Sequence, residues 1–254
     1  MIKRWQARYA KFDNRQIIES KDWQHDEPRY VGVPSMSSIA EHLAENLNIK
    51  LKTRIASLQQ NAKWQLYDEQ GRRYGVFDWV ISTVPAPQTS TLLPTRFKCH
   101  TDIKRLKMRA CFALMLACRK PLPLEFTAAH VINADISWLA VNSRKPGRTK
   151  PFTLMVHSSE EYAEKHIDDD RDKIIKHLCS ETTRIIGHDV NVAEYKRVHR
   201  WRFANNATSD ENYPIFIDHN LQLAACGDWC LGGRVEGAFN AAYNLVKKMQ
   251  ESIL

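Results

Sequence analysis

Residues Leu221–Val246, which read LQLAACGDWCLGGRVEGAFNAAYNLV, decide the fold. The apolar run from Leu221 to Cys226 is typical of a buried strand, and it breaks at Gly227-Asp228. After a glycine turn at Gly232-Gly233, apolar residues recur from Val235 to Met249 at the i, i+3, i+4, i+7 spacing of a helix with one buried face. The stretch therefore predicts a strand, a turn and an amphipathic helix.

A strand that ends at an acid, followed by a glycine turn and a helix N-terminus, suits a polar dinucleotide. The carboxylate of Asp228 can accept a hydrogen bond from a sugar hydroxyl. The helix start offers backbone N–H groups without intrahelical partners, together with the positive end of the helix dipole. A helix-capping role for Asp228 is the simpler alternative.

Composition limits the class of protein. The chain has 254 residues, 43% of them hydrophobic and 9% aromatic, as in an ordinary globular protein of one or two domains. The longest apolar run, Ala110–Cys118, is far shorter than the roughly 20 residues of a membrane helix. The N-terminus lacks the pattern of a signal peptide. We therefore expect no membrane span.

Charge and cysteine usage favour a protein with a basic surface in a reducing compartment. The net charge of +8 is spread along the chain without a nucleic-acid-binding module, so a basic surface or a phosphate-bearing ligand explains it better than nucleic acid. The six cysteines show no metal-binding spacing and mostly sit in apolar surroundings, which predicts free thiols and a cytoplasmic location. A redox pair of Cys226 and Cys230 is a weaker alternative.

The motif Cys226–Ala238, CGDWCLGGRVEGA, resembles the C-terminal flavin-binding motif of the FAD-dependent amine oxidase superfamily, and more narrowly that of the bacterial renalase-like NAD/FAD-dependent oxidoreductases. Further segments resemble the same family in the same order: Pro28–Leu43, Val80–Leu93, Trp138–Arg148, Leu154–Ser159 and His199–Ala204. Together they span nearly the whole chain.

The chain departs from the family pattern at its start. The family opens with a strand, a G-x-G-x-x-G turn and a helix, and no G-x-G occurs in this chain. That turn lets the backbone approach a pyrophosphate, so we expect the chain alone to bind FAD weakly. Either a longer reading frame is truncated, or the chain is a decayed relative.

A missing first strand would leave apolar surface uncovered. We expect exposed apolar faces on Val80–Val84 and Leu221–Cys226, on the order of several hundred Å². Such a chain would aggregate, form a homo-oligomer or be unstable.

The predicted fold is α/β (α+β), with an incomplete Rossmann-type FAD-binding domain and a substrate domain built on a mainly antiparallel sheet. We expect residues 1–94 and 214–254 to form the first domain and 95–213 the second. Expected elements include strands at 49–51, 53–59, 63–68, 74–77 and 80–84 in the first domain, with strands at 108–118, 128–132, 136–141, 152–157 and 192–202 and a helix at 168–186 in the second.

The resemblance implies roles for individual residues on the cofactor side. Gly227 and Asp228 would hold the ribityl or pyrophosphate region of FAD, and the helix start would face the flavin ring. The same resemblance implies that the adenosine part of FAD would contact the strand that contains Ile55 and the end of the strand at Thr83 and Pro85. The residues concerned are Arg234, Val235, Glu236 and Ala238 at the helix start, and Ile55, Thr83 and Pro85 on the adenosine side.

On the substrate side, aromatic rings can stack on a flat nicotinamide-like ring, while Asn and His can hydrogen-bond a carboxamide. The candidates are Trp138, Asn142, His157, His199 and Trp201. Each of them taken alone is as well explained by packing or by surface exposure.

The resemblance implies an oxidase that takes hydride from dihydropyridine isomers of NAD(P)H onto FAD and reduces dioxygen to hydrogen peroxide. The expected partner is thus a pyridine dinucleotide, with no nucleic acid, membrane or metal. Two alternatives stay open: an FAD-dependent amine oxidase, and an inactive remnant that does not hold FAD.

Overall fold

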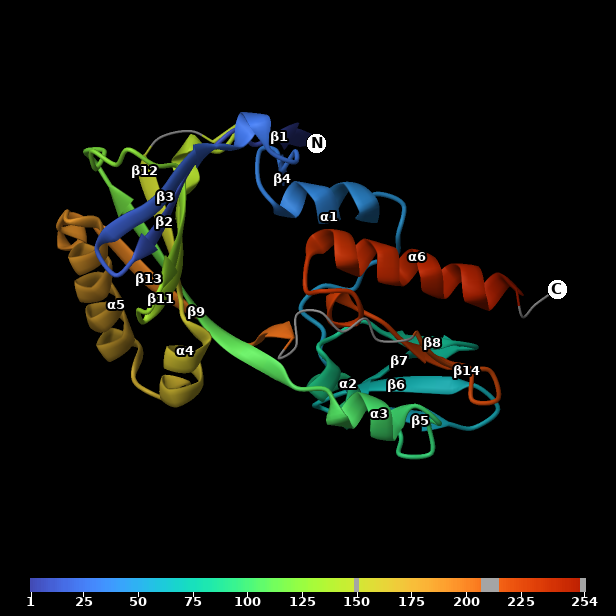
Figure 1. Ribbon diagram of the computed structural model, residues 1–254. Helices are drawn as coiled ribbons and strands as arrows, with labels where there is room; N and C mark the ends of the chain where they lie inside the picture. The colour runs from blue at the N-terminus through green and yellow to red at the C-terminus, as the bar shows by residue number, and fades with distance from the viewer. Residues whose placement is uncertain (149–150, 207–214, 252–254) are drawn as a thin grey trace. The chain divides into compact units, whose positions relative to one another are not determined.

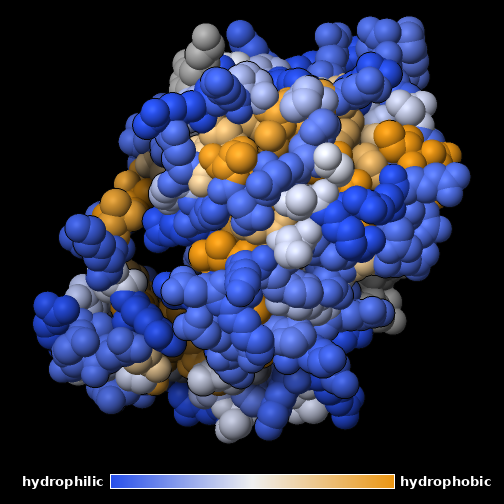
Figure 2. All heavy atoms as spheres, turned by 90° about the vertical axis from the view of Figure 1, so that its left-hand side faces the viewer, coloured by the Kyte–Doolittle hydropathy of each residue, from blue (hydrophilic) through white to orange (hydrophobic). Residues whose placement is uncertain are grey.

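The computed structural model describes residues 1–148, 151–206 and 215–251. The chain divides into two compact units: residues 1–49 with 110–201, called unit 1 here, and residues 50–109 with 202–254, called unit 2. None of the described helices is long and apolar enough to cross a membrane. Figure 2 shows one face of the molecule, on which hydrophilic side chains predominate and apolar groups appear between them.

Unit 1 is organised on a seven-stranded sheet, in which strands β2 (Arg8–Asp13) and β10 (Ala128–Ile132) pair in parallel (Figure 1). The sheet order is β13 (Tyr195–Asn206), β9 (Met108–Cys118), β12 (Phe152–Ser158), β11 (Ile136–Val141), β10 (Ala128–Ile132), β2 (Arg8–Asp13) and β3 (Gln16–Asp22). The remaining elements are the β1–β4 pair (Ile2–Arg4 and Tyr30–Gly32), α1 (Ser37–Ala44), α4 (Glu160–His166), α5 (Arg171–Ile186) and the short 3-10 helices η1 (Trp23–His25), η2 (Asn142–Arg144) and η3 (Val190–Val192).

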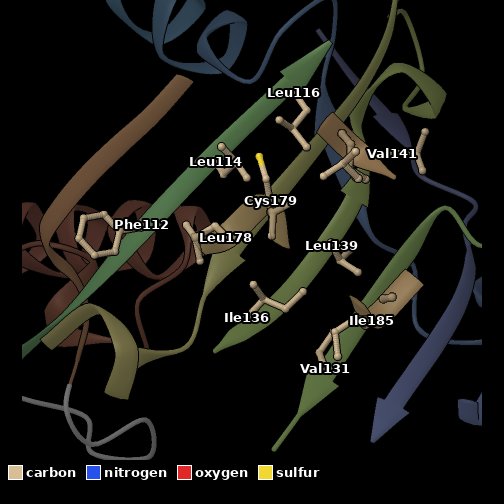
Figure 3. Close-up of a cluster of buried hydrophobic side chains, with 14 of the residues drawn as sticks. Phe112, Leu114, Leu116, Val131, Ile136, Leu139, Val141, Leu178, Cys179 and Ile185 are labelled. Carbon is tan, nitrogen blue, oxygen red and sulfur yellow. The ribbon is translucent and has the colours of Figure 1, made fainter. Parts of the chain in front are cut away.

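Helices α4 and α5 lie over one face of this sheet (Figure 1). Helix α5 begins where the Asp170 carboxylate accepts hydrogen bonds from the N–H groups of Asp172 (2.8 Å) and Lys173 (3.2 Å). It ends at Gly187, whose φ of 71° a glycine adopts without strain. The helix buries Leu178 and Cys179 against the sheet, and Figure 3 shows these side chains among those of β9, β10 and β11.

Unit 2 contains two small sheets. One has the order β14 (Phe216–Asp218), β15 (Leu223–Ala225) and β8 (Val80–Ser82), with β15 and β8 parallel. The other is the antiparallel meander of β5 (Ile55–Gln60), β6 (Trp64–Asp68) and β7 (Arg73–Phe77). The helices are α2 (Ala86–Leu92), α3 (His100–Arg105) and α6 (Val235–Glu251), and the 3-10 helix η4 covers Asp228–Cys230.

The prediction of an apolar face exposed on Leu221–Cys226 is wrong. Strand β15 lies between β14 and β8, so both of its edges are paired, and Leu223 is fully buried in the same cluster as Ala241 and Leu245 of α6. The prediction is confirmed only in part for β8, an edge strand on which Val80 is buried while Ile81 is 42% exposed.

Two predicted strands are also corrected. Residues 49–51 form no strand, and Leu51 is 80% exposed, because the alternation of Ile49, Lys50 and Leu51 has no partner strand. Strand β13 begins at Tyr195, not at Val192, because Val190–Val192 forms the 3-10 helix η3, whose start is capped by the Asp189 carboxylate.

The compact units have different bounds from the predicted domains. Residues 1–49 group with 110–201, because β2 and β3 extend the large sheet through the parallel pairing of β2 with β10. The predicted boundary at residues 213 and 214 lies outside the described residues. The assignment of cofactor and substrate roles to the two parts of the chain stays a prediction.

Candidate functional site

The strand, turn and helix predicted for Leu221–Met249 form one connected site in unit 2. Strand β15 runs parallel to β8, with Ala225 opposite Ser82, and the Cys226 N–H donates to the Ser82 carbonyl at 3.1 Å. Because the two strands point the same way, the segments that follow them emerge at the same edge of the sheet. Thr83–Pro85 and Gly227-Asp228 therefore lie at that shared edge.

The backbone carbonyl of Asp228 stabilises the turn, and its side-chain carboxylate is partly exposed. Its carbonyl accepts hydrogen bonds from the N–H groups of Leu231 (3.0 Å) and Gly233 (2.9 Å), and its Oδ1 accepts from the Trp229 N–H at 2.9 Å. Gly232 and Gly233 have φ values of 79° and 70°, which glycine adopts without a Cβ clash. Oδ2 of Asp228 has no hydrogen-bond partner among the described residues, so this half-buried carboxylate keeps an acceptor for a ligand.

Trp229 connects the turn to the segment that follows β8 through a hydrogen bond. It is 1% exposed, stacks on Phe216 at 5.6 Å between ring centroids, and donates from Nε1 to the Val84 carbonyl at 3.1 Å. The same carbonyl accepts from the Thr89 hydroxyl at 2.9 Å. Sequence reasoning missed Trp229 and Thr89 as positioning residues, although the Trp lay inside the quoted motif.

The start of α6 faces an open surface. Arg234 precedes the helix, and Val235 and Glu236 in its first turn are exposed, while Ala238 is half-buried. Gly237 is buried where the helix passes over the 3-10 turn: a Cβ there would overlap the Leu231 carbonyl oxygen. The first amides of this long helix are thus presented next to Asp228, with the dipole favouring negative charge.

The residues predicted for the adenosine side are only partly brought together. Thr83 is exposed and Pro85 is the residue that starts α2, both directly after β8. Ile55, half-buried, begins β5 in the separate meander sheet. The strand pairing that joins Thr83 and Pro85 to Gly227 does not include Ile55.

The two cysteines of the motif do not fit a redox pair. Both are buried free thiols in the structure. Burial raises the pKa of Cys230 to about 12 and also raises the pKa of Cys226. Since thiolates are the reactive species, neither side chain is activated near neutral pH.

In unit 1 the structure places Trp138 directly opposite His157 on the paired strands β11 and β12. Burial lowers the pKa of His157, with Lys145 contributing, so the imidazole is neutral near pH 7. The Trp138 ring stacks near Trp23 and lines a pocket of about 580 Å³. Asn142 follows β11 as the first residue of η2 and is half-buried.

His199 and Trp201 lie elsewhere in unit 1. Both are exposed on β13, with ring centroids 4.2 Å apart. Strands β9 and β12 separate β13 from β11 in the sheet, so three strand spacings, about 14 Å, lie between Trp138's strand and theirs. The five predicted substrate residues therefore do not form one site within unit 1.

The comparisons with known proteins agree with this arrangement. A model of the family described as flavin-containing amine oxidoreductase matches residues 16–248. The chain belongs to this family. The match includes the strand–turn–helix segment from Leu221 to Lys248. It also includes every lining residue of the Trp138 pocket except Trp5 and Tyr9.

Solved structures of oxidases share the fold. A protein from Exiguobacterium sp. described as a candidate protoporphyrinogen oxidase has a TM-score of 0.68 at 16% identity, over 86% of this chain and 51% of that chain. Putrescine oxidase bound to putrescine has a TM-score of 0.61 at 14% identity, over 88% and 54%. Cyclohexylamine oxidase from Brevibacterium oxydans has 0.61 at 11% identity, over 85% and 53%. The chain spans about half the length of these structures.

Family membership confirms the coarser predictions. The protein has a mixed α/β fold like that of flavin-dependent oxidases, and its family uses flavin for oxidation and reduction. The finer predictions, which concern the substrate, the strength of flavin binding and the N-terminal unit, stay proposals.

Proposed function

We propose that this chain is the flavin- and substrate-contacting part of a renalase-like oxidoreductase. Unit 2 would hold FAD through the Asp228 turn and the start of α6, and unit 1 would bind the substrate ring. The substrate proposed is a dihydropyridine isomer of NAD(P)H, with dioxygen as the acceptor. The observation that carries the proposal is the Asp228 carboxylate, which is fixed at Oδ1, has no partner for Oδ2 among the described residues, and precedes the exposed first turn of α6.

The residues present fit a flavin nucleotide. The first turn of α6 is exposed, and the first N–H groups of a helix have no intrahelical partner, so this turn can offer donors to a ligand. Asp228 would accept a hydrogen bond from a hydroxyl of the ribityl chain, and the amides after Arg234 would face the pyrimidine edge of the ring. Helix-dipole donors there stabilise negative charge on the ring system.

When bound, FAD would supply the two-electron oxidation of the substrate, with dioxygen as the acceptor and hydrogen peroxide as the product. The protein's own part is to orient and to exclude water. Trp138 offers a flat face for the substrate ring, and the neutral His157 opposite it can hydrogen-bond a carboxamide. No general base is required for hydride transfer.

The amine-oxidase alternative has the solved structures in its favour, since putrescine oxidase and cyclohexylamine oxidase share the fold. The charges of the Trp138 pocket favour the dihydropyridine. The Lys145 ammonium has no carboxylate partner among the described residues, lies 4.9 Å from the centre of the Trp5 ring and would repel a protonated amine. Lys21 and Arg29 are paired with acidic side chains and add little to this repulsion.

A peroxide assay separates these functions. The full chain with excess FAD is given dihydropyridine isomers of NADH in one reaction and putrescine or cyclohexylamine in another. We expect peroxide release, matched by formation of NAD⁺, only with the dihydropyridines. Peroxide release with the amines alone would overturn the substrate proposed, and a chain that neither binds FAD nor releases peroxide with any of these substrates would favour the inactive remnant.

A further inference from the structure

The pocket lined by Trp138 is built entirely within unit 1 and has a volume of about 580 Å³, within the usual range for small-molecule sites. Its walls come from β2, β3, β4, β10 and β11 together with residues that precede and follow them. The aromatic side chains that line it are Trp5, Tyr9, Trp23, Tyr30 and Trp138.

These rings are arranged as a wall for a flat ligand. Trp23 lies at the centre, stacked with Tyr9 (5.5 Å between centroids, 21° between planes) and with Trp138 (6.3 Å, 17°). Trp5 meets Trp23 edge-on at 5.3 Å and 90°. Three nearly parallel rings favour an aromatic or conjugated ligand over a branched aliphatic one, since planar rings stack with little loss of conformational freedom.

Trp5 adds a hydrogen-bond donor without an acceptor. Its side chain is 8% exposed, and Nε1 has no hydrogen-bond partner among the described residues. Buried indole N–H groups are usually paired, because leaving one unpaired costs stability. An indole only donates, so a ligand that completes this hydrogen bond must supply an acceptor atom.

The charges at the pocket identify that acceptor as an anion. Lys21 is paired with Glu19 (3.2 Å) and Asp26 (3.6 Å), and Arg29 is paired with Asp26 (3.3 Å). Lys145 has no carboxylate partner in the part of the chain that the structure describes, and its Nζ lies 4.9 Å from the centre of the Trp5 ring. The unpaired donor and the ammonium without a carboxylate partner thus both belong to the contact between Trp5 and Lys145.

The ionisation of the neighbouring groups agrees with this reading. Burial, followed by the charge of Arg148, lowers the pKa of Lys145, which is the mark of a cation without a counter-charge. Burial, followed by Lys11, lowers the pKa of His130, so His130 adds no second positive charge near neutral pH.

We propose that this pocket binds a planar, π-rich organic anion, whose ring packs against the aromatic side chains that line the pocket and whose anionic group lies next to the Lys145 ammonium and the Trp5 indole. The proposal that this anion is the substrate rests on the proposed function. The binding of an aromatic anion to the pocket does not require flavin. The anionic group is a carboxylate or a phosphate on or near the ring.

Isothermal titration calorimetry of the flavin-free full chain tests this. The probes are 2-naphthoate, 2-naphthyl phosphate, the uncharged 2-naphthamide and the cation 2-naphthylmethylammonium. We expect both anions, or one of them, to bind at least about 10-fold more tightly than the amide, with the ammonium weakest. The tighter of the two anions identifies carboxylate or phosphate. Equal binding of amide and anions, or no heat from any probe, would overturn the proposal.

Matched variants separate a local cation from overall charge. Lys145→Met keeps the aliphatic stem and should weaken anion binding about 10-fold while leaving the amide unchanged. Lys120→Met removes the same charge from an exposed position outside the pocket and should change little. If both variants weaken anion binding equally, a general electrostatic attraction replaces the site. If the protein binds the anions but does not oxidise dihydropyridines, the proposed function is contradicted, whereas the proposal that the pocket binds an aromatic anion is retained.

Discussion

Replacing Asp228 with alanine is expected to weaken flavin binding by about 10- to 100-fold. The carboxylate is fixed by the Trp229 N–H and keeps Oδ2 for a ligand hydroxyl. A hydrogen bond to a charged group is worth about 1.5–3 kcal/mol, and each 1.4 kcal/mol is a factor of ten in affinity. The backbone of the turn survives the change, since Leu231 and Gly233 donate to the Asp228 carbonyl. Titration of the full chain with FAD, followed by flavin fluorescence, measures the effect.

Two control variants sharpen this experiment. Asp228→Asn keeps the shape and one acceptor oxygen, so we expect an intermediate loss of affinity. Asp189→Ala removes an aspartate that caps the 3-10 helix η3 in unit 1, where its carboxylate accepts from the Asn191 N–H at 2.8 Å, and should leave FAD binding unchanged. Wild-type affinity in Asp228→Ala would show that the carboxylate is a structural cap and no more.

Replacing Gly237 with alanine is expected to destabilise the protein by about 2–3 kcal/mol, although alanine is the better helix former by roughly 0.5–1 kcal/mol. The added Cβ would overlap the Leu231 carbonyl oxygen and lie 3.2 Å from the carbonyl carbon. Both atoms belong to the backbone, which cannot rotate away as a side chain can. Helix α6 must therefore move off the 3-10 turn, and the overlap outweighs the gain in helix propensity. Urea unfolding monitored by circular dichroism gives the difference.

Asn240→Ala is the matched control for this variant, because Asn240 is exposed on the same helix. We expect that substitution to leave stability unchanged or to raise it by about 0.5 kcal/mol through helix propensity. A Gly237→Ala protein as stable as the wild type would mean that α6 does not pack on Leu231 as described.

The sequence predicted the elements whose patterns are local. Met108–Cys118, Ala128–Ile132 and Ile136–Val141 are strands with the predicted bounds, because each is a short apolar run. Helix α6 begins at Val235 as predicted and runs to Glu251, but its buried face was not the predicted one. Gly237, Ala241 and Leu245 are buried, whereas Val235, Phe239 and Val246 of the predicted apolar stripe are at least half exposed. The turn between β15 and α6 could be predicted because Gly227, Asp228, Gly232 and Gly233 are typical turn residues.

What the sequence could not give is the pairing of distant segments. Strand β3 is exposed along its whole length and carries no alternation, and only its pairing with β2 makes it a strand. The pocket depends on the parallel register of β2 with β10, in which Tyr9 lies opposite Ala128. That register brings Tyr9 and Trp23 close to Trp138, more than one hundred residues later in the chain, and no local pattern records it.

The central claim is that the turn at Asp228 and the start of α6 bind a flavin nucleotide. Amide hydrogen exchange of the full chain, with and without saturating FAD, tests it most directly, because exchange slows where a ligand covers backbone N–H groups. We predict slower exchange at residues 228–238, with loss of that protection in Asp228→Ala. FAD binding that leaves these amides unprotected would contradict the account.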